Sequence, residues 1–568
     1  MSIPSVKCTW HIAEYDRPRT RALAQAAGIP PIVAHILLLR GIATSAQVQR
    51  FLYPALSHLS DPFLLSGMRP AVARIAEARE RGEHVLIFGD YDVDGIAATA
   101  ILVNAFKRFG LEHFSHDMPQ RLTEGYGLSA DRVEAAAHDG VHLIVTVDNG
   151  ISAHEAAQRA RELGLGLIIT DHHSIENGLP EAHAVINPKR EDRSYPGYHL
   201  CGAGVAFKLA EALNGTKNDL DIAALGTVAD IVPLCGENRA IVSLGLRHMV
   251  KHQRTGLAQL AAAAGFELSD VTSERIGFQL GPRLNAAGRL AEGLTALELL
   301  LAECPIAAGK MARQLDAANE ERRAIERVMF NEAAEELDAF LSPELQGIVV
   351  ARRGWHAGVV GIVASRLQGR YHRPVVMIAI DDEGIGRGSG RAGAGFDLVG
   401  ALGTCHEHLV KFGGHRAAAG LTIRSEDIEA FRAAFQAEAL RQLGPGERRA
   451  GLAIDVLASF SEIDNALLAA LKRLEPIGHQ NPAPLFCSLG VTLLPQSLRV
   501  LKDQHLKMSV RQGATVFPAI GFNMAERFFT QDVPREVDIA YTPQFNTWRG
   551  ETSIQLLLKD IRPAGPGP

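Results

Sequence analysis

Residues 85–98 read VLIFGDYDVDGIAA, and this stretch decides the fold of the chain. Its four leading apolar residues predict a short buried strand, and a turn rich in aspartate and glycine then precedes a helix-like stretch that ends at Phe109. The same pattern recurs at residues 143–147, before VDNG, and at residues 167–170, before DHHS. Strands that alternate with helices predict a parallel sheet. Because ligands bind beyond the carboxyl ends of such strands, we expect the three acidic turns to meet at one edge.

The first acidic turn predicts a metal site. Asp90, Asp92 and Asp94 place three carboxylates within one short turn that ends at Gly95. Like charges at this range repel, and a divalent cation with a preference for oxygen ligands, such as Mg²⁺ or Mn²⁺, removes that conflict. EF-hand spacing would place a glutamate where Ile101 stands, which argues against a calcium-binding loop. A solvated acidic loop is the simpler alternative.

Further candidate ligands follow the later strands. Asp148 comes directly after the second strand, where it could equally cap a helix. His172 and His173 come after the third strand, and the alternative for them is a pair of exposed loop histidines. Asp230 stands in the apolar stretch LGTVADIVPL, where a carboxylate needs a partner or a metal. Together these residues supply enough ligands for two metals, which predicts hydrolysis of a phosphoester by in-line displacement.

The remaining sequence predicts an α/β protein with several domains. A charged stretch with apolar residues at helical spacing predicts a long linking helix, and a second, smaller α/β unit with Gly-rich segments follows it. Beyond Gly444-Pro445-Gly446, short β-like runs with interspersed aromatic residues predict a β-barrel of the OB type. The expected domains are a helical lead-in at 1–65, a parallel-sheet catalytic domain at 66–300, the linking helix at 301–341, the second α/β domain at 342–445 and the barrel at 446–568.

Composition narrows the class of protein. Six cysteines without CxxC spacing argue against a disulfide framework or a zinc site and fit the cytoplasm. The N-terminus lacks the pattern of a secretory signal, and the apolar runs are too short to span a membrane. The formal charge of −6 does not favour nucleic acid, so a nucleic-acid partner would require positive charge concentrated in a groove.

The motifs together resemble a known superfamily. DYDVDG, VDNG, TDHH and TVADIVPL, in this order, are similar to the four motifs of the DHH phosphoesterases, and FGGHRAAAG resembles the signature of the companion DHHA1 domain. RLTEGYGLS, RLNAAGRL and LEPIGHQNPAPLF resemble the bacterial RecJ branch. The resemblance implies a Mn²⁺- or Mg²⁺-dependent exonuclease with two ions that degrades single-stranded DNA from the 5′ end to 5′-mononucleotides, in DNA repair and recombination. It also implies a RecQ-type helicase and a single-strand DNA-binding protein as partners, and a monomer is the default state.

By resemblance, the ligands take different roles. Asp148 would bridge the two metals, Asp92 would help to hold one, and the other would be held by Asp94, His172 and Asp230. Asp90 is the least secure of the metal ligands, and His173 would assist catalysis by orienting a ligand or by contacting the substrate. The pyrophosphatase branch has a histidine where Phe88 stands here, which disfavours that activity.

A second set of residues is expected to hold the strand. Arginine suits phosphate because its planar fork donates two parallel hydrogen bonds. By resemblance, Arg121, Ser389 and Arg391 would form a pocket for the 5′-phosphate, with Arg391 in a loop between glycines and His415 on the terminal nucleotide or nearby phosphates. The other candidates are Arg283, Arg289 and, for base stacking, Trp548. Salt bridges for the arginines and a core position for the aromatics are the structural alternatives.

Three other functions compete with this interpretation. The chain could be a DHH phosphodiesterase of short oligoribonucleotides or cyclic dinucleotides, although those enzymes generally lack the linking helix and the barrel. It could be a DNA-binding relative without catalysis, although that would be expected to have lost metal ligands. A calcium-stabilised binding protein is disfavoured by the ligand spacing.

Overall fold

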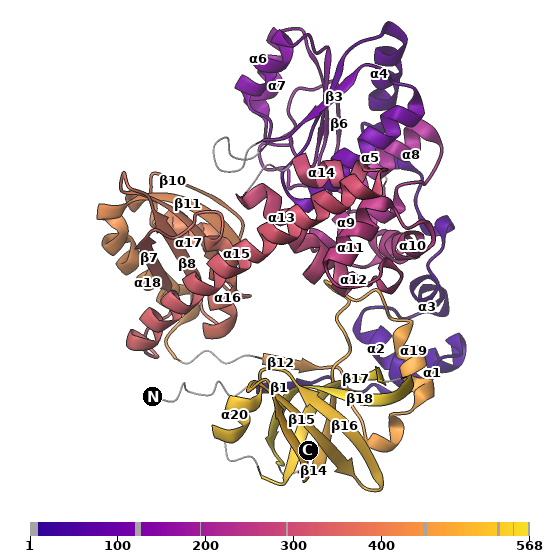
Figure 1. Cartoon of the computed structure of the whole chain (residues 1–568), viewed down its shortest axis with the longest axis vertical. Helices are drawn as coiled ribbons and strands as arrows, with labels where there is room; N and C mark the ends of the chain where they lie inside the picture. The colour runs from indigo at the N-terminus through magenta and orange to yellow at the C-terminus, as the bar shows by residue number, and fades with distance from the viewer. Residues whose placement is uncertain are drawn as a thin grey trace. The chain divides into compact units, whose positions relative to one another are not determined.

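The structure is a computed structural model that describes residues 9–119, 127–192, 195–290, 294–446, 451–530, 534–548 and 550–565. Arg121 lies outside these residues, and so do the side chains of Arg289 and Trp548. The chain divides into two compact units, the ribbons of which are shown in Figure 1. The larger unit contains Trp10–Gly288, Glu292–Asp316 and Ala453–Pro568, and the smaller one is formed mainly by Ala317–Leu452.

A parallel sheet forms the centre of the larger unit, as the sequence predicts. Its strands lie in the order β3-β2-β4-β5-β6, and every neighbouring pair is parallel. The strands are β2 (Val85–Phe88), β3 (Phe114–Asp117), β4 (Leu143–Val147), β5 (Gly166–Thr170) and β6 (Ala184–Ile186). The chain passes from β2 to one side and then returns to the other, so the strand order reverses between β2 and β4. Ligand sites in doubly wound sheets occur at such a point.

Helices cover both faces of this sheet, which explains why its inner strand β2 is continuously apolar. Alternate residues face opposite cores: Val85 and Ile87 pack with the helices on one face, and Leu86 and Phe88 with those on the other. One face is covered by α4 (Met68–Arg81), α5 (Val93–Phe109) and α8 (Gly202–Asn214), and the other by α6 (Ala130–His138) and α7 (His154–Glu162). The first core continues into α9 (Leu220–Ala229), α10 (Gly236–His252), α11 (Thr255–Ala263), α12 (Ser273–Arg275), a π-helical turn (Ile276–Leu280), α13 (Gly281–Leu290) and α14 (Leu294–Leu301).

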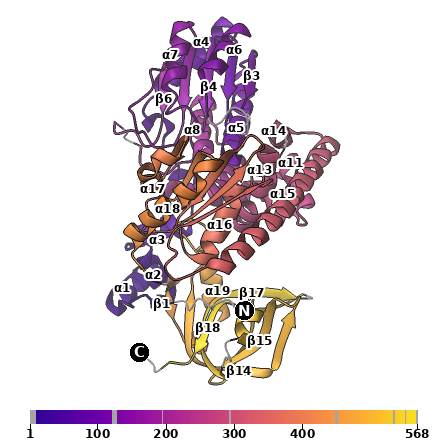
Figure 2. The same ribbon diagram turned by 90° about the vertical axis from the view of Figure 1, so that its left-hand side faces the viewer.

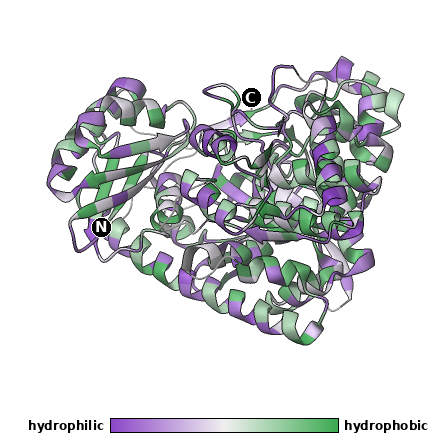
Figure 3. Ribbon diagram, turned by 90° about the horizontal axis from the view of Figure 1, so that it is seen from above, coloured by the Kyte–Doolittle hydropathy of each residue, from purple (hydrophilic) through white to green (hydrophobic). Residues whose placement is uncertain are grey.

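The predicted linking helix is α15 (Pro305–Phe340), which begins in the larger unit and ends in the smaller one. The smaller unit contains a mixed sheet in the order β10-β11-β9-β8-β7, in which β7 and β8 are parallel and the other pairs antiparallel. Its strands appear mostly in the hydrophobic colour in Figure 3. The elements are β7 (Ile348–Arg353), α16 (Val360–Tyr371), β8 (Val375–Ile380), β9 (Ile385–Arg391), α17 (Leu398–Thr404), β10 (Lys411–Gly414), β11 (Ala418–Arg424) and α18 (Ile428–Leu443).

The expected loop around Arg391 is wrong, because these residues form strand β9. The glycines of GRGSGR occupy alternate positions that pack against the core. A Cβ at Gly386 would lie 2.7 Å from Ile378 Cγ2, and one at Gly388 would lie 2.8 Å from Leu421 Cδ1. Glycine is therefore present here for close packing within a sheet and not for the flexibility of a loop.

The C-terminal region forms the predicted closed β-barrel (Figure 2). Five strands follow the order β14-β15-β16-β18-β17, and pairing of β17 with β14 closes the ring. The strands are β14 (Phe486–Leu501), β15 (His505–Gln512), β16 (Thr515–Gly521), β17 (Glu536–Trp548) and β18 (Glu551–Pro563). The short strand β13 (Val456–Leu457) pairs with β14, and the helices of this region are α19 (Asn465–Lys472) and α20 (Ala525–Thr530).

The N-terminal helices share one hydrophobic core with the barrel. Leu23, Ile36 and Leu37 belong to the same buried cluster as Phe460 and Phe486. The helices are α1 (Arg17–Ala27), α2 (Pro31–Leu39) and α3 (Ser45–Leu52), and β1 (Thr9–Ile12) pairs with β12 (Gly451–Ile454). No single helix in the described ranges is long and apolar enough to cross a membrane, and α1 with α2 passes that test only as a pair bent by 111°.

Candidate metal centre

The turn after β2 builds the first part of the site. Asp92 caps the N-terminus of α5, because its Oδ1 accepts hydrogen bonds from the backbone N–H groups of Asp94 (2.9 Å) and Gly95 (3.1 Å). Asp90 and Asp94 are 2% and 1% exposed. A Cβ at Gly95 would lie 2.6 Å from that of Asp90, so the turn requires glycine. The turn therefore gathers three carboxylates, of which Asp90 and Asp94 are buried and Asp92 is half-buried.

The N-terminus of α8 holds Asp94 in place. The two carboxylate oxygens of Asp94 accept hydrogen bonds from the backbone N–H groups of Gly202 (2.6 Å) and Ala203 (2.9 Å). The partial positive charge at a helix N-terminus favours a carboxylate in this position. A Cβ at Gly226 of α9 would lie 2.7 Å from Asp94 Oδ1, so glycine there leaves room for the carboxylate.

The turn after β4 brings Asp148 into the same space. Asp148 has a left-handed backbone with φ of 64° and is 2% exposed. Such backbone strain in a residue other than glycine is typical of functional sites. The next residue, Asn149, donates from Nδ2 to the carbonyls of Phe88 (3.2 Å) and Val147 (2.9 Å), and thereby ties the ends of β2 and β4 together. Gly202 again leaves room, because its Cβ would lie 2.4 Å from Asp148 Oδ1.

The turn after β5 places the two histidines. Asp171 Oδ1 accepts hydrogen bonds from the backbone N–H groups of His172 (2.6 Å) and His173 (3.0 Å), and lies 2.7 Å from His173 Nδ1. Asp171 Oδ2 accepts a hydrogen bond from the Ile151 N–H (2.9 Å). Asp171 is thus a residue that orients His173 through its ring nitrogen Nδ1.

His172 connects the turns to Asp230. Its Nε2 lies 3.1 Å from Asp148 Oδ1, 3.8 Å from Asp94 Oδ2 and 3.6 Å from Asp230 Oδ2. Asp230 caps the C-terminus of α9. The structure therefore brings together all six predicted metal ligands and His173. They form three overlapping groups whose ligand atoms lie within 4.8 Å of one another: Asp90–Asp92–Asp148, Asp94–His172–Asp230 and Asp148–His172–His173.

Burial and mutual repulsion perturb the ionisation of these groups. Burial raises the pKa of Asp94, and raises that of Asp148 well above its usual value, with the charge of Asp94 adding to the effect on Asp148. Burial, together with the charges of Asp94 and Asp92, raises the pKa of Asp230 to about 9. Burial lowers the pKa of His172 to about 4, so its imidazole is neutral at pH 7. Burial also lowers the pKa of His173, but the hydrogen bond with Asp171 and the charges of Asp171 and Asp94 together outweigh it, and the net shift is upward.

These residues fit divalent metal ions. Several carboxylates in one buried site cannot all ionise unless a cation compensates their charge. Carboxylate oxygens with neutral imidazole match the ligand preference of Mn²⁺ and are compatible with Mg²⁺. The missing side chains at Gly202 and Gly226 keep the space around the carboxylates open. Asp148 and His172 each belong to two of the three groups.

The residues expected to hold the strand lie in different settings. Arg283 donates from Nε to Asp316 Oδ1 (2.9 Å), so it forms the salt bridge that was the alternative to a phosphate contact. Ser389 and Arg391 lie on β9, where an Arg391 guanidinium N–H donates to Ser389 Oγ (2.8 Å). His415 is exposed after β10, and its N–H donates to the carbonyl of Ala418, the residue opposite Arg391. These three polar residues therefore lie at one end of the smaller sheet.

Three supporting residues escaped sequence reasoning. Asn149 and Gly202 are described above; Asn149 stands inside the motif VDNG, whereas Gly202 stands beside none of the motifs. The third is Asn285 of α13, whose Oδ1 accepts a hydrogen bond from the Val93 N–H (3.1 Å). The motif RLNAAGRL also packs against the first turn, because a Cβ at Gly288 would lie 2.7 Å from the carbonyl oxygen of Tyr91. This motif thus supports the turn that carries Asp90, Asp92 and Asp94. Its presence in the sequence is explained without a phosphate contact by Arg283.

Fold and site together define a metal-dependent phosphoesterase of the DHH class. The family model described as "DHH family, N-terminal domain" matches residues 84–229, that of the DHHA1 domain matches residues 345–440, and that of the RecJ OB domain matches residues 454–560.

The sequence relatives are more specific. The chain is 36% identical over 557 residues to the single-stranded-DNA-specific exonuclease RecJ of Bacillus subtilis. This alignment covers 98% of this chain and 71% of that protein. It is 35% identical to RecJ of Escherichia coli, over 94% of this chain and 96% of that protein. The crystal structure of RecJ in complex with Mn²⁺ from Thermus thermophilus matches with a TM-score of 0.84 at 30% identity, over 98% of this chain and 80% of that one. The chain belongs to the RecJ family of exonucleases.

Proposed function

We propose that this chain removes nucleotides one at a time from the 5′ end of single-stranded DNA, with two divalent cations, in DNA repair and recombination. The observation that carries the proposal is the overlap of three ligand groups around Asp148 and His172 at the carboxyl edge of the parallel sheet. Two ions in such a site neutralise the charge that develops on the attacking and leaving oxygens of an in-line displacement at phosphorus. The relatives named as single-stranded-DNA-specific exonucleases support the choice of substrate.

The side chains of the site have distinct tasks in this proposal. Asp148 would be shared between the ions, because it belongs to the group with Asp90 and Asp92 and lies 3.1 Å from Nε2 of His172, which belongs to the group with Asp94 and Asp230. Asp90 and Asp92 would complete one ion, and Asp94, His172 and Asp230 the other. This arrangement supports Asp90 as a ligand more strongly than the sequence did.

His173 has a separate role. Because Asp171 accepts its Nδ1–H, the ring presents Nε2 to the site in a fixed orientation. The raised pKa of His173 favours its protonated form, which suits contact with a phosphate oxygen or donation of a proton to the leaving oxygen.

We assign recognition of the 5′ end, which sets the direction of degradation, to the smaller unit. Ser389 and Arg391 are hydrogen-bonded to each other, and a Cβ at Gly361 of α16 would lie 2.9 Å from Ser389 Oγ and 3.0 Å from an Arg391 guanidinium nitrogen. The pair thus lies directly against a helix residue without a side chain. We assign the terminal 5′-phosphate to this pair, with His415 on a neighbouring phosphate or nucleotide.

The remaining expectations about biology belong to the same proposal. The five cysteines in the described part of the chain are all free, which is consistent with a cytoplasmic protein. A monomer, and partnership with a RecQ-type helicase and a single-strand DNA-binding protein, stay predictions from the family resemblance.

The test is a polarity assay. The protein is incubated with Mn²⁺ and a long single strand that carries a label at either the 5′ or the 3′ end, with EDTA and a duplex of the same sequence as controls. We expect early release of a labelled mononucleotide from the 5′-labelled strand and none with EDTA. Release from the 3′ end, or cleavage restricted to dinucleotides or short oligoribonucleotides, would show that another activity of the DHH class is the correct one.

A further inference from the structure

One sequence motif remains without a role in the proposed reaction. The segment 473–482, RLEPIGHQNP, connects α19 to the barrel, and we call it the strap. It closes on itself, because the backbones of Gly478 and Asn481 exchange two hydrogen bonds (2.9 and 3.0 Å). The Asn481 side chain is 1% exposed and donates to the carbonyls of Leu474 (2.9 Å) and Pro476 (2.7 Å). The strap is therefore a rigid, internally bonded loop.

A buried arginine of the catalytic domain grips the strap. Arg239 of α10 is 2% exposed, and its guanidinium lies 3.7 Å from the ring centre of Phe51. It donates hydrogen bonds to the carbonyls of four consecutive strap residues and to that of Phe51, at 2.7 to 3.2 Å. The hydroxyl of Ser273 adds a hydrogen bond to the carbonyl of Ile477 (2.6 Å). The catalytic domain thus holds the strap through its backbone, which fixes its position closely.

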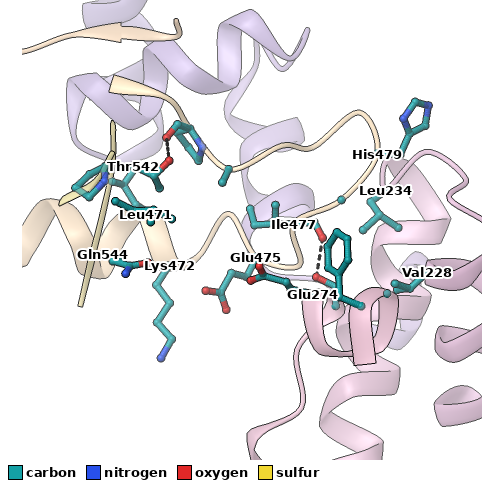
Figure 4. Close-up of a pocket in the computed structure, with 18 of the residues that line it drawn as sticks. Val228, Leu234, Glu274, Leu471, Lys472, Glu475, Ile477, His479, Thr542 and Gln544 are labelled. Atoms are coloured by element: carbon teal, nitrogen blue, oxygen red, sulfur yellow. Dashed lines mark hydrogen bonds between the residues drawn. The ribbon is translucent and has the colours of Figure 1, made fainter. Parts of the chain in front are cut away.

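The far end of the strap reaches the loop that carries Asp230. The Leu234 N–H donates to the carbonyl of His479 (2.9 Å), and Leu234 is 2% exposed. The approach is close, because a Cβ at Gly478 would lie 2.6 Å from Leu234 Cδ1. Figure 4 shows the strap passing from Lys472 to His479, with Leu234 beside it and Val228 near the end of α9. Residues of the strap, this loop and the barrel line one groove of about 780 Å³.

The position of the Asp230 carboxylate depends on its loop more than the positions of Asp92 and Asp94 depend on the turn that carries them. Asp94 is held by two N–H groups of α8, and Asp92 is held by the N–H groups that it caps. The Asp230 carboxylate lies 3.6 Å from His172 Nε2. Within the described part of the chain, no backbone N–H group donates a hydrogen bond to it. Ile231, the next residue, has a left-handed backbone with φ of 57°, a strained conformation that persists only where the surrounding structure holds it.

We propose that the strap is a positioning element for Asp230, through the contacts of His479 and Gly478 with Leu234. The proposal rests on the assignment of Asp230 as a metal ligand. It makes the affinity of one metal depend on a segment that belongs to the barrel side of the chain. Since supporting residues around metal ligands typically change affinity by about 10- to 100-fold when they are altered, the effect is measurable.

The experiment is a direct Mn²⁺ titration of the metal-free protein, followed by electron paramagnetic resonance of the unbound ion. Gly478→Ala should weaken one of two binding events about tenfold, since the new Cβ must displace Leu234, and should leave the other unchanged. Leu234→Ala removes the atoms with which the new Cβ clashes. The double variant Gly478→Ala/Leu234→Ala should therefore bind Mn²⁺ with the same affinity as Leu234→Ala alone. Gly369→Ala, which places a Cβ in open space on α16, is the matched control.

The outcomes separate the two proposals. Absence of Mn²⁺ binding to the wild-type protein would contradict the proposed function. Two intact binding events in Gly478→Ala, or equal weakening of both, would overturn the positioning role, because a general loss of stability does not discriminate between ions. If Gly478→Ala does not fold, Ser273→Ala decides: it removes only the hydrogen bond to Ile477, and an unchanged Mn²⁺ affinity would contradict the proposal.

Discussion

Removal of the metals should make the stability of this protein fall as the pH rises. Burial and the neighbouring charges of Asp94 and Asp92 raise the pKa of Asp230 from 3.8 to about 9 in the metal-free fold. An acid whose pKa is raised on folding stabilises the fold fully below its ordinary pKa, and that contribution is lost as the pH rises towards the folded value. The pKa values of Asp94 and Asp148 are shifted in the same direction.

The magnitude follows from proton linkage. Between pH 7 and pH 8.5 the folded protein holds one more proton on Asp230 than the unfolded chain, which lowers the free energy of unfolding by about 1.4 kcal/mol per pH unit, or about 2 kcal/mol in total. His172 does not oppose this change, because burial lowers its pKa to about 4 and the unfolded histidine is also largely neutral above pH 7. We therefore expect the melting temperature of the metal-free protein to fall across this range, and the increase caused by Mn²⁺ to grow.

Calorimetry gives the sharper measurement. Titration of Mn²⁺ at pH 7 in buffers with different ionisation enthalpies counts the protons released on binding, and we expect about one or more. Asp230→Asn is the control, and should lower the count by about one. A metal-free protein whose melting temperature is constant from pH 7 to 8.5, and which releases no protons on binding Mn²⁺, would refute the interpretation that these carboxylates are held protonated by burial.

Four further predictions concern single residues. Asp148→Ala should reduce turnover by about a thousandfold or more while binding of single-stranded DNA, measured by fluorescence anisotropy, stays within a fewfold of wild type; parallel loss of binding would contradict its assignment to catalysis. Gly202→Ala should weaken Mn²⁺ binding in a titration, because the added Cβ would lie 2.4 Å from Asp148 Oδ1, and an unchanged affinity would show that the carboxylate has room to move. Asp171→Asn should lower kcat about 10- to 100-fold with little change in KM, since it weakens the orientation of His173; an effect on KM alone would argue against that role. Arg391→Ala should abolish the preference for 5′-phosphorylated over 5′-hydroxyl ends in competition assays, and a retained preference would remove this residue from the pocket.

The sequence by itself determined the elements whose pattern is local. The strands at 85–88 and 143–147 could be predicted because helices bury both of their faces, so that every residue is buried and all but Thr146 are apolar. The acidic turns could be placed at one edge because parallel strands end on the same side of a sheet. The motif order then predicted the ligands, and the structure gathers them into three overlapping groups.

Only the tertiary structure decided the features that depend on contacts distant in sequence. Asp94 is held by α8, Asn285 of α13 supports the first turn, and Asp171 orients His173, and none of these bonds leaves a periodic signal. Local composition also misled: the glycines around Arg391 suggested a loop, but their close packing against neighbouring side chains places them in β9. The difference has one physical reason. Strand and helix patterns record which face of a segment is buried, whereas a single hydrogen bond or a missing Cβ gains its meaning only from the partner that the fold places beside it.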